Sequence, residues 1–146
     1  MRTSEIKDKI VDRIQAITPT GRASSRDVFR HIDHAARFGL QTQAQGRFPD
    51  RSFHVTISTV PTRADMLTTD AYQAEFTIGV FYNAGQQFIE DRITQDAEAI
   101  DFALVLTHQD SADLFNVTVE PQGVEEFESV ILMELRARCL YRLTGV

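Results

Sequence analysis

The 146-residue sequence contains a single cysteine, Cys139, so no disulfide can form within the chain. One unpaired cysteine suits a reducing compartment, in which thiols stay reduced. No apolar run comes close to the roughly twenty residues that a membrane-spanning helix needs. Residues 1–14 carry charges throughout and lack the uninterrupted apolar stretch of a signal peptide. We therefore expect one globular domain, residues 1–146, with no membrane partner.

The sequence also lacks a recognisable catalytic or cofactor-binding pattern. It has neither a glycine-rich phosphate loop nor a nucleophile elbow. Cys139 lies within an apolar row, which favours a packing role over a nucleophilic one. His31 and His34 share one face of a helix beside Asp33, but no further metal ligand follows at a recognisable spacing. We predict no catalytic residue, no metal site, no cofactor and no enzyme activity.

Charge is unevenly divided along the chain. Residues 1–64 hold eleven Lys and Arg against six Asp and Glu, a net charge of +5. Residues 65–146 hold four against fifteen, a net charge of −11. Folding can average this polarity away, or it can leave a basic side and an acidic side suited to stacking or ring formation. Composition leaves both interpretations open.

The best-patterned stretch runs from Phe127 to Leu143. Its odd positions are apolar except for Ser129, and five of its eight even positions are charged. Side chains alternate between faces along a strand, so the stretch predicts one long strand with an apolar row on one face. The even row is itself apolar at Val130 and Leu132. The second face therefore also needs a cover, from another subunit or from an N-terminal arm.

The charged members of this even row are candidates for contacts between subunits. They alternate in sign and can pair across an interface or, equally, across neighbouring strands of the same sheet. These residues are Glu134, Arg136, Arg138 and Arg142.

Apolar periodicity predicts two helices, at residues 4–17 and 86–105. Alternation predicts three further strands, at residues 53–59, 72–82 and 114–119. Glu120-Pro121-Gln122-Gly123 is a turn sequence that leads into the final strand, so we expect the last two strands to form a hairpin. The expected fold is an α+β domain in which a four-stranded, mostly antiparallel sheet packs two helices on one face.

Residues 19–52 are the least regular part, and we expect an exposed arm or loop there. Ser24-Ser25 can cap a short helix that carries Val28, Phe29 and Ile32. A loop of this length in a compact domain is usually functional or mobile. Its arginines are predicted to be available to a partner. They are Arg22, Arg26, Arg30, Arg37 and Arg47, with Arg51 just beyond.

This order of elements resembles the tail terminator, or tail completion, proteins of long-tailed phages and phage-derived particles. The resemblance covers essentially the whole chain and begins with the isoleucine-spaced helix before Thr18-Pro19. It continues in AEFTIGVFYN at 74–83, FIEDRITQDAEAIDFAL at 88–104 and FNVTVEPQGVEEFESVILMELRARCLYRL at 115–143. That family has no signature motif, so no individual residue role carries over.

The resemblance implies a hexameric ring that caps the completed tail tube, stops its polymerisation and presents a docking surface to the head connector. The implied partners are further copies of the chain, the tail tube protein and the head-closure or connector protein, with non-specific proximity to DNA in the lumen. The implied location is the tail–neck junction of a virion assembled in the host cytoplasm. We hypothesise that the arginine-bearing segment 22–51 contacts one neighbour, while the acidic helix 86–105 or the hairpin 114–143 meets another.

Two alternatives stay open beside this reading. Within the same class, the chain is a head-closure or other neck protein, or the terminator of a contractile tail. In a different class, it is a small cytoplasmic α+β enzyme or ligand-binding domain, because a ligand pocket can be purely apolar. Sixfold rings in solution favour the first class, and a compact monomer with a ligand favours the second.

Overall fold

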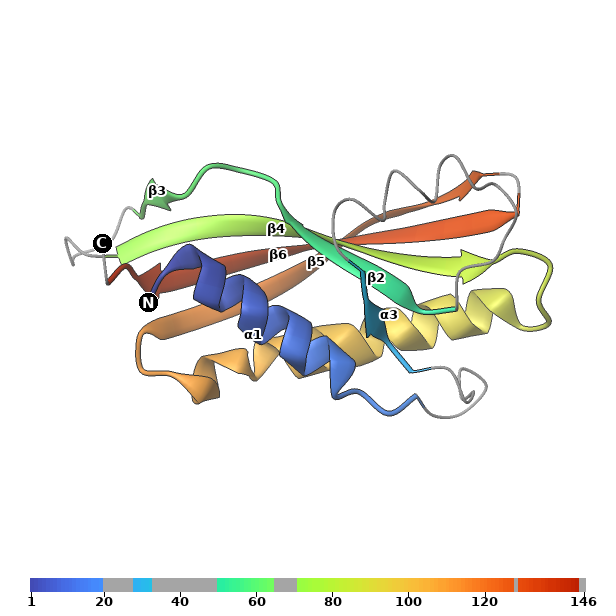
Figure 1. The fold of residues 1–146 in the computed structure, drawn as a ribbon, viewed down its shortest axis with the longest axis horizontal. Helices are drawn as coiled ribbons and strands as arrows, with labels where there is room; N and C mark the ends of the chain where they lie inside the picture. Colours follow the sequence, from blue (N-terminus) through green and yellow to red (C-terminus); the bar gives the residue numbers. More distant parts are fainter. Residues whose placement is uncertain (20–27, 33–49, 65–70, 128, 145–146) are drawn as a thin grey trace.

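The computed structural model describes residues 1–19, 28–32, 50–64, 71–127 and 129–144. Figure 1 shows their elements coloured along the chain. The helices are α1 (Thr3–Gln15) and α3 (Ile89–Val105), with a 3-10 turn η2 (Thr107–Asp110) after α3. The strands are β1 (Arg30–His31), β2 (Ser52–Ile57), β3 (Thr62–Arg63), β4 (Ala71–Asn83), β5 (Leu114–Phe127) and β6 (Val130–Arg142).

All six of these strands belong to one sheet, in the order β1–β2–β4–β6–β5, with β3 paired to β4. The β1–β2 pair is parallel and the other pairs are antiparallel. At the centre is the β4–β6 ladder, whose thirteen residue pairs run from Ala71–Arg142 to Asn83–Val130. At about 3.3 Å per residue each of these strands extends roughly 43 Å, more than twice the usual length.

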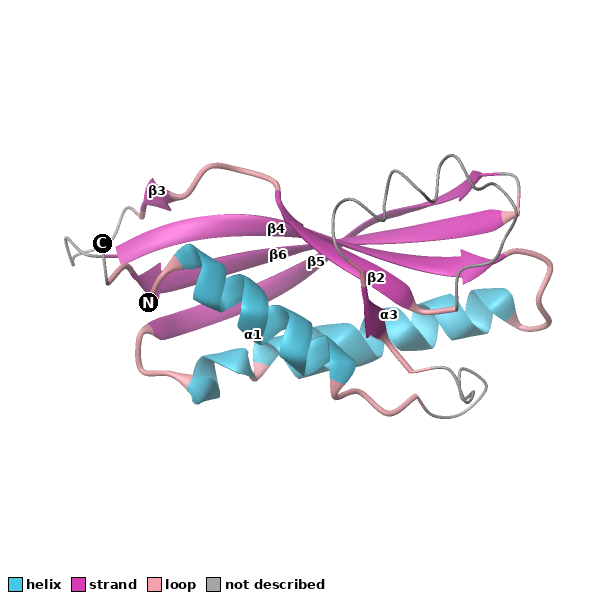
Figure 2. Ribbon diagram, in the orientation of Figure 1, coloured by secondary structure: helices cyan, strands magenta, loops and turns pink. Residues whose placement is uncertain are grey.

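Both helices pack on the sheet and share one hydrophobic core with the predicted apolar row. Figure 2 shows α1 crossing in front of the sheet while α3 runs alongside it. The isoleucines of the α1 stripe and the last apolar residues of α3 are buried against the odd-numbered side chains of β6. Every odd position from Ile131 to Tyr141 is buried, so the predicted inward row is confirmed over this range. Its predicted first residue, Phe127, instead ends β5 and is exposed. Each large side chain buried in this core contributes about 1.5–3 kcal/mol.

The predicted α+β class and the two helices are confirmed, but the predicted number of strands is wrong. The sheet has six strands in place of four, because β1 and β3 add short pairings along the β2 side of β4. Residues 28–32 contain no helix. The amide of Arg30 donates to the carbonyl of Arg51 and that of Ile32 to Phe53, so contacts distant in sequence override the local helical pattern.

The predicted turn at residues 120–123 is also wrong. Strand β5 continues through it to Phe127, with an irregularity in its pairing between Pro121 and Gly123, and the chain reverses between Phe127 and Val130. Because β5 lies at the edge of the sheet, the missing N–H of Pro121 removes no bond from a central ladder. Gly123 has a φ of 154°, which suits a β-bulge. The last two strands do form the predicted hairpin, with a longer reach than expected.

The second face of the sheet has a small apolar cluster of its own. Val130 and Leu132 of β6 are buried with Phe81 of β4, and the half-buried Ile32 packs against them. Ile32 follows β1 within the segment predicted to be an arm. Part of this second face is therefore covered by the chain itself, as one of the two sequence interpretations anticipated.

Gly79 of β4 marks the tightest approach on this face. A methyl group at its Cα would lie 2.0 Å from Cε1 and 2.6 Å from Nδ1 of His54. The His54 ring is buried and lies against Phe81, with ring centroids 5.5 Å apart. A side chain at position 79 would therefore force the buried ring of His54 to shift.

We expect Gly79→Ala to destabilise the fold by about 1–3 kcal/mol through overpacking against the His54 ring. Urea unfolding followed by circular dichroism measures the free energy. In a His54→Ala background the ring is gone, so the cost of Gly79→Ala should shrink. An equal cost in both backgrounds would contradict this role of the ring.

Candidate functional site

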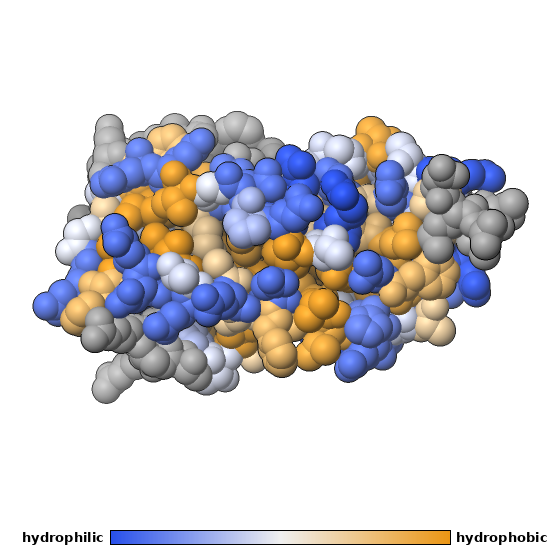
Figure 3. All heavy atoms as spheres, turned by 180° about the vertical axis from the view of Figure 1, so that it is seen from behind, coloured by the Kyte–Doolittle hydropathy of each residue, from blue (hydrophilic) through white to orange (hydrophobic). Residues whose placement is uncertain are grey.

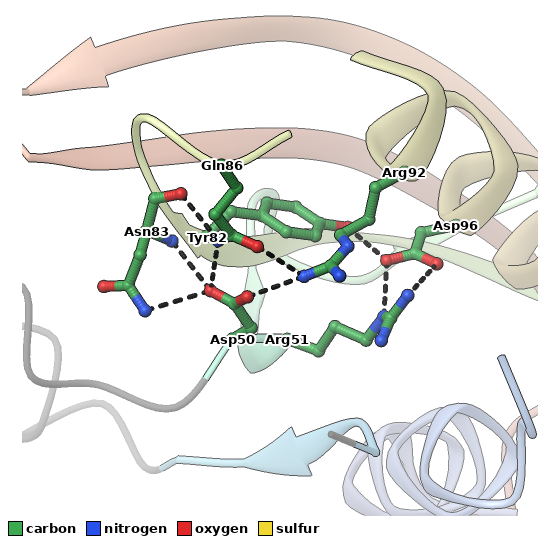
Figure 4. A network of polar contacts seen from close by, with 7 residues as sticks. All are labelled: Asp50, Arg51, Tyr82, Asn83, Gln86, Arg92 and Asp96. Carbon is green, nitrogen blue, oxygen red and sulfur yellow. Dashed lines mark hydrogen bonds and ion pairs between the residues drawn. The ribbon is translucent and has the colours of Figure 1, made fainter. Parts of the chain in front are cut away.

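Seven polar residues gather where the end of β4, the start of α3 and the residues before β2 meet (Figure 4). They form two layers around two carboxylates, one fully buried and one nearer the surface. They are Asp50, Arg51, Tyr82, Asn83, Gln86, Arg92 and Asp96.

The inner layer is an ion pair between Arg51 and Asp96. Nε and Nη2 of Arg51 donate to the two carboxylate oxygens of Asp96 at 2.8 and 3.2 Å. The two side chains are 0% and 2% exposed. The hydroxyl of Tyr82 donates a further hydrogen bond of 2.8 Å to Asp96. A bidentate pair with an added donor is the geometry in which a buried charge is best compensated.

The outer layer is organised by the carboxylate of Asp50. It accepts hydrogen bonds from the amide nitrogens of the Asn83 backbone and side chain, at 2.8 and 3.0 Å. It also accepts hydrogen bonds from the side-chain amide of Gln86, at 2.8 Å, and from the guanidinium of Arg92, at 2.7 Å. These bonds hold the end of β4, the connection to α3 and the first turn of α3 on one side chain.

The main chain of Arg51 joins two further elements, and its side chain reaches a third. Its amide donates to the carbonyl of Phe81 at 2.9 Å, and its carbonyl accepts from Arg30 at 3.1 Å. Its φ of 64° lies in the left-handed region, which costs a non-glycine residue about 1–3 kcal/mol. The guanidinium also lies 5.7 Å from the ring centre of Phe29. One residue thus ties β1, β4 and α3 together.

Burial controls protonation in the inner layer. Desolvation raises the pKa of Asp96, and the hydrogen bonds from Arg51 and Tyr82 oppose that rise. Desolvation, with the neighbouring Asp96 charge, raises the pKa of Tyr82 well above its usual value, so its hydroxyl stays protonated and keeps donating. Protein donors engage both carboxylates. The network fixes the end of β4, the start of α3 and the residues before β2 relative to one another.

Sequence patterns missed this network and misjudged Arg51, which was grouped with arginines available to a partner. The structure buries it completely. A signal was present at Asp96, which lies three residues after Ile93 and four before Ile100, on the apolar stripe of α3. An acid at such a position needs a buried partner, although the pattern does not say which.

The predicted arm residues fall into three groups. Arg22, Arg26, Arg37 and Arg47 lie outside the described residues. Arg30 is exposed on β1. The remaining described parts of residues 19–52 are largely inside the fold, because Phe29 and residues 50–52 are buried.

The structure gives three of the predicted β6 residues partners within the same chain. Arg138 lies directly opposite Glu75 of β4 and donates to it at 3.0 Å, while Nε of Arg136 is 3.7 Å from the same carboxylate. Nη1 of Arg142 is 3.8 Å from Asp113. Such partly exposed pairs each contribute about 0–1 kcal/mol. They fit the interpretation of cross-strand ion pairs within one subunit.

Glu134, the fourth predicted β6 residue, is half-buried and aligns with Gly79 on β4 and Gly123 on β5. Figure 3 views the side of the molecule away from α1, where hydrophilic residues gather across the middle with hydrophobic ones around them. Among the described residues, the large hydrophobic side chains that remain exposed are Val28, Ile57, Val60, Phe88, Phe102, Val105, Val124 and Phe127.

Metal-ligand types do not cluster within the described ranges, which contain no group of three or more His, Cys, Asp or Glu side chains able to hold an ion. His31 lies on β1 with its ring 5.5 Å from that of Phe53, and Asp33 and His34 fall outside the described residues. None of the described helices has the length and apolar character to cross a membrane. No protein-family model matches the chain, and no curated protein matches its sequence.

We expect Asp96→Asn to destabilise the fold by about 3–5 kcal/mol, because it leaves the buried Arg51 guanidinium without a counter-charge. Tyr82→Phe removes one hydrogen bond to the same carboxylate and should cost only about 1 kcal/mol. Denaturant unfolding measures both. The pair Arg51→Met with Asp96→Leu should cost less than Asp96→Asn alone; a larger cost would argue against an uncompensated charge.

Cys139 should be unreactive in the native protein. It lies on β6, between β4 and β5, with its side chain fully buried in the core. Desolvation raises its pKa to about 12, so the thiolate is scarce at neutral pH. We expect a thiol reagent such as dithionitrobenzoate to label it only as the chain unfolds in denaturant. Rapid labelling at pH 8 without denaturant, with circular dichroism unchanged, would speak against the packing role.

Proposed function

We propose that the chain is a structural ring protein of a phage-like tail. Copies assemble as a hexamer that caps the completed tail tube, stops its polymerisation and provides the docking surface for the head connector. The proposal grows from the resemblance in element order and is supported by the α+β fold, with its two helices packed on a mostly antiparallel sheet.

One observation carries the proposal beyond the fold class. The last eight residues of β5, from Glu120 to Phe127, are all exposed, although the β6 residues that they pair with are mostly buried. Val124 and Phe127 in this stretch are 57% and 51% exposed. A strand that extends so far past its own core leaves an edge and apolar side chains for another chain to cover.

A second feature supports more than one contact surface. Phe102 on α3 is 70% exposed, and Val105 is exposed one helical turn further on. These two side chains lie on a helix, apart from the β5 edge. A ring subunit needs separate surfaces for its neighbours, for the tube and for the connector. We assign the α3 surface to one of the two axial partners.

Native mass spectrometry and negative-stain microscopy test the ring. We expect six chains of 16.5 kDa, about 99 kDa in total, and images with sixfold symmetry. Added to polymerising tail tube protein, the ring should bind tube ends and limit further growth. A persistent monomer that ignores tube ends would overturn the proposal.

A Phe102→Ser variant refines the same experiment. It removes the exposed aromatic side chain from α3 without changing the sheet. Hexamers should therefore persist, while binding to either tube ends or connectors weakens. The control is Gln15→Ser, which changes an exposed side chain at the end of the other helix, α1, outside every surface assigned to a partner. Rings that bind head fractions and never tubes would identify a head-closure protein in place of a terminator.

A further inference from the structure

The β5 edge of the sheet is acidic. Strand β5 is the last strand on its side, with β6 as its one strand neighbour in the described part of the chain. The strand contains three glutamates and no basic residue, and all three glutamates are exposed. They are Glu120, Glu125 and Glu126.

The opposite edge is basic. It is formed by β1, β2 and β3, which all lie on the side of β4 away from β6. Residues 28–32 and 52–64 contain Arg30 and Arg63, both exposed, and no acidic residue. Beyond Phe53, no strand in the described ranges pairs with the outer side of β2.

The two edges lie at the same level of the sheet. Thr56 of β2 aligns with Thr77 of β4, which aligns with Arg136 of β6 and then with Glu120 of β5. Three strand spacings of about 4.8 Å put these edges roughly 14 Å apart, and they face in opposite directions. A second copy can therefore continue the arrangement on either side without the two contacts competing for space.

Exposed apolar side chains accompany the charges. Val124 and Phe127 lie on the β5 side, while Val28, Ile57 and Val60 lie on or beside the strands of the other edge. Five of the eight large hydrophobic side chains exposed among the described residues thus belong to these two edges. An apolar contact ringed by opposite charges is the usual make-up of a specific interface.

We propose that the β5 edge of one copy docks against the β1–β2–β3 edge of a second copy, so that copies associate head to tail. This edge pairing rests on the proposed function, because a ring requires that copies of the chain associate. Two β5 edges do not suit each other, because three glutamates would face three glutamates. A head-to-tail contact between unlike surfaces closes into a ring when the rotation per copy divides a full turn.

Charge reversal of each edge tests the pairing. One variant carries Glu120→Lys, Glu125→Lys and Glu126→Lys, and the other carries Arg30→Glu and Arg63→Glu. Each alone brings like charges together, so we expect at least a tenfold loss in association by sedimentation velocity, with circular dichroism melting unchanged. A 1:1 mixture should reassemble, because alternating copies restore opposite charges at every contact.

The control variant changes three exposed acids on α3, as Glu90→Lys, Glu98→Lys and Asp101→Lys, and should associate as the unchanged protein does. If this variant dissociates while the β5 variant does not, the acidic surface is α3 and the proposal fails. If rings persist in both edge variants, or folded variants do not reassemble when mixed, the edge pairing fails while the ring stands. If the unchanged protein never associates, alone or on tail tubes, the proposed function fails as well.

Discussion

The ladder between β4 and β6 is the constraint on which the rest of the structure depends. Its thirteen residue pairs place β6 between two neighbours, so all other elements are positioned relative to this strand. Because side chains alternate, a slip of one residue would turn Arg136 and Arg138 toward the helices and expose the core row. The isoleucine stripe of α1 and the end of α3 pack on that row, so a change of register would remove the contacts of both helices.

The buried pair of Arg51 and Asp96 is a second contact that fixes elements around the ladder. A buried ion pair contributes little net stability, since desolvation of both charges offsets their attraction. Its value lies in geometry, because a guanidinium held by two oxygens accepts one arrangement of its neighbours. Through the main chain of Arg51, that arrangement sets β1 beside β2 and ties both to the end of β4. The position of β1 at the edge of the sheet thus depends on the residue that pairs with the buried Asp96.

The sheet is longer than its own helices use. The core occupies one face, while the last residues of β5 extend past it with their side chains in solvent. Natural sheets usually protect such an edge, and here three exposed glutamates lie along it. The uneven charge along the sequence becomes a difference between two edges of one sheet. In the proposed head-to-tail contact, this difference would bring unlike edges together.

The sequence by itself determined every element whose pattern is local: the two helices, the α+β class and the apolar row from Ile131 to Tyr141. Helical and strand periodicities depend only on residues close together in the sequence, so they can be recognised without knowing what each element packs against. Only the tertiary structure decided the two-residue strands, the bulge at Gly123 in place of a turn, and the partnership of Arg51 with Asp96, 45 residues apart. Each depends on a partner brought near by the ladder, and a short stretch cannot specify what lies across from it. The same reason explains why Arg30, predicted to lie in an arm, lies on β1 at one edge of the sheet.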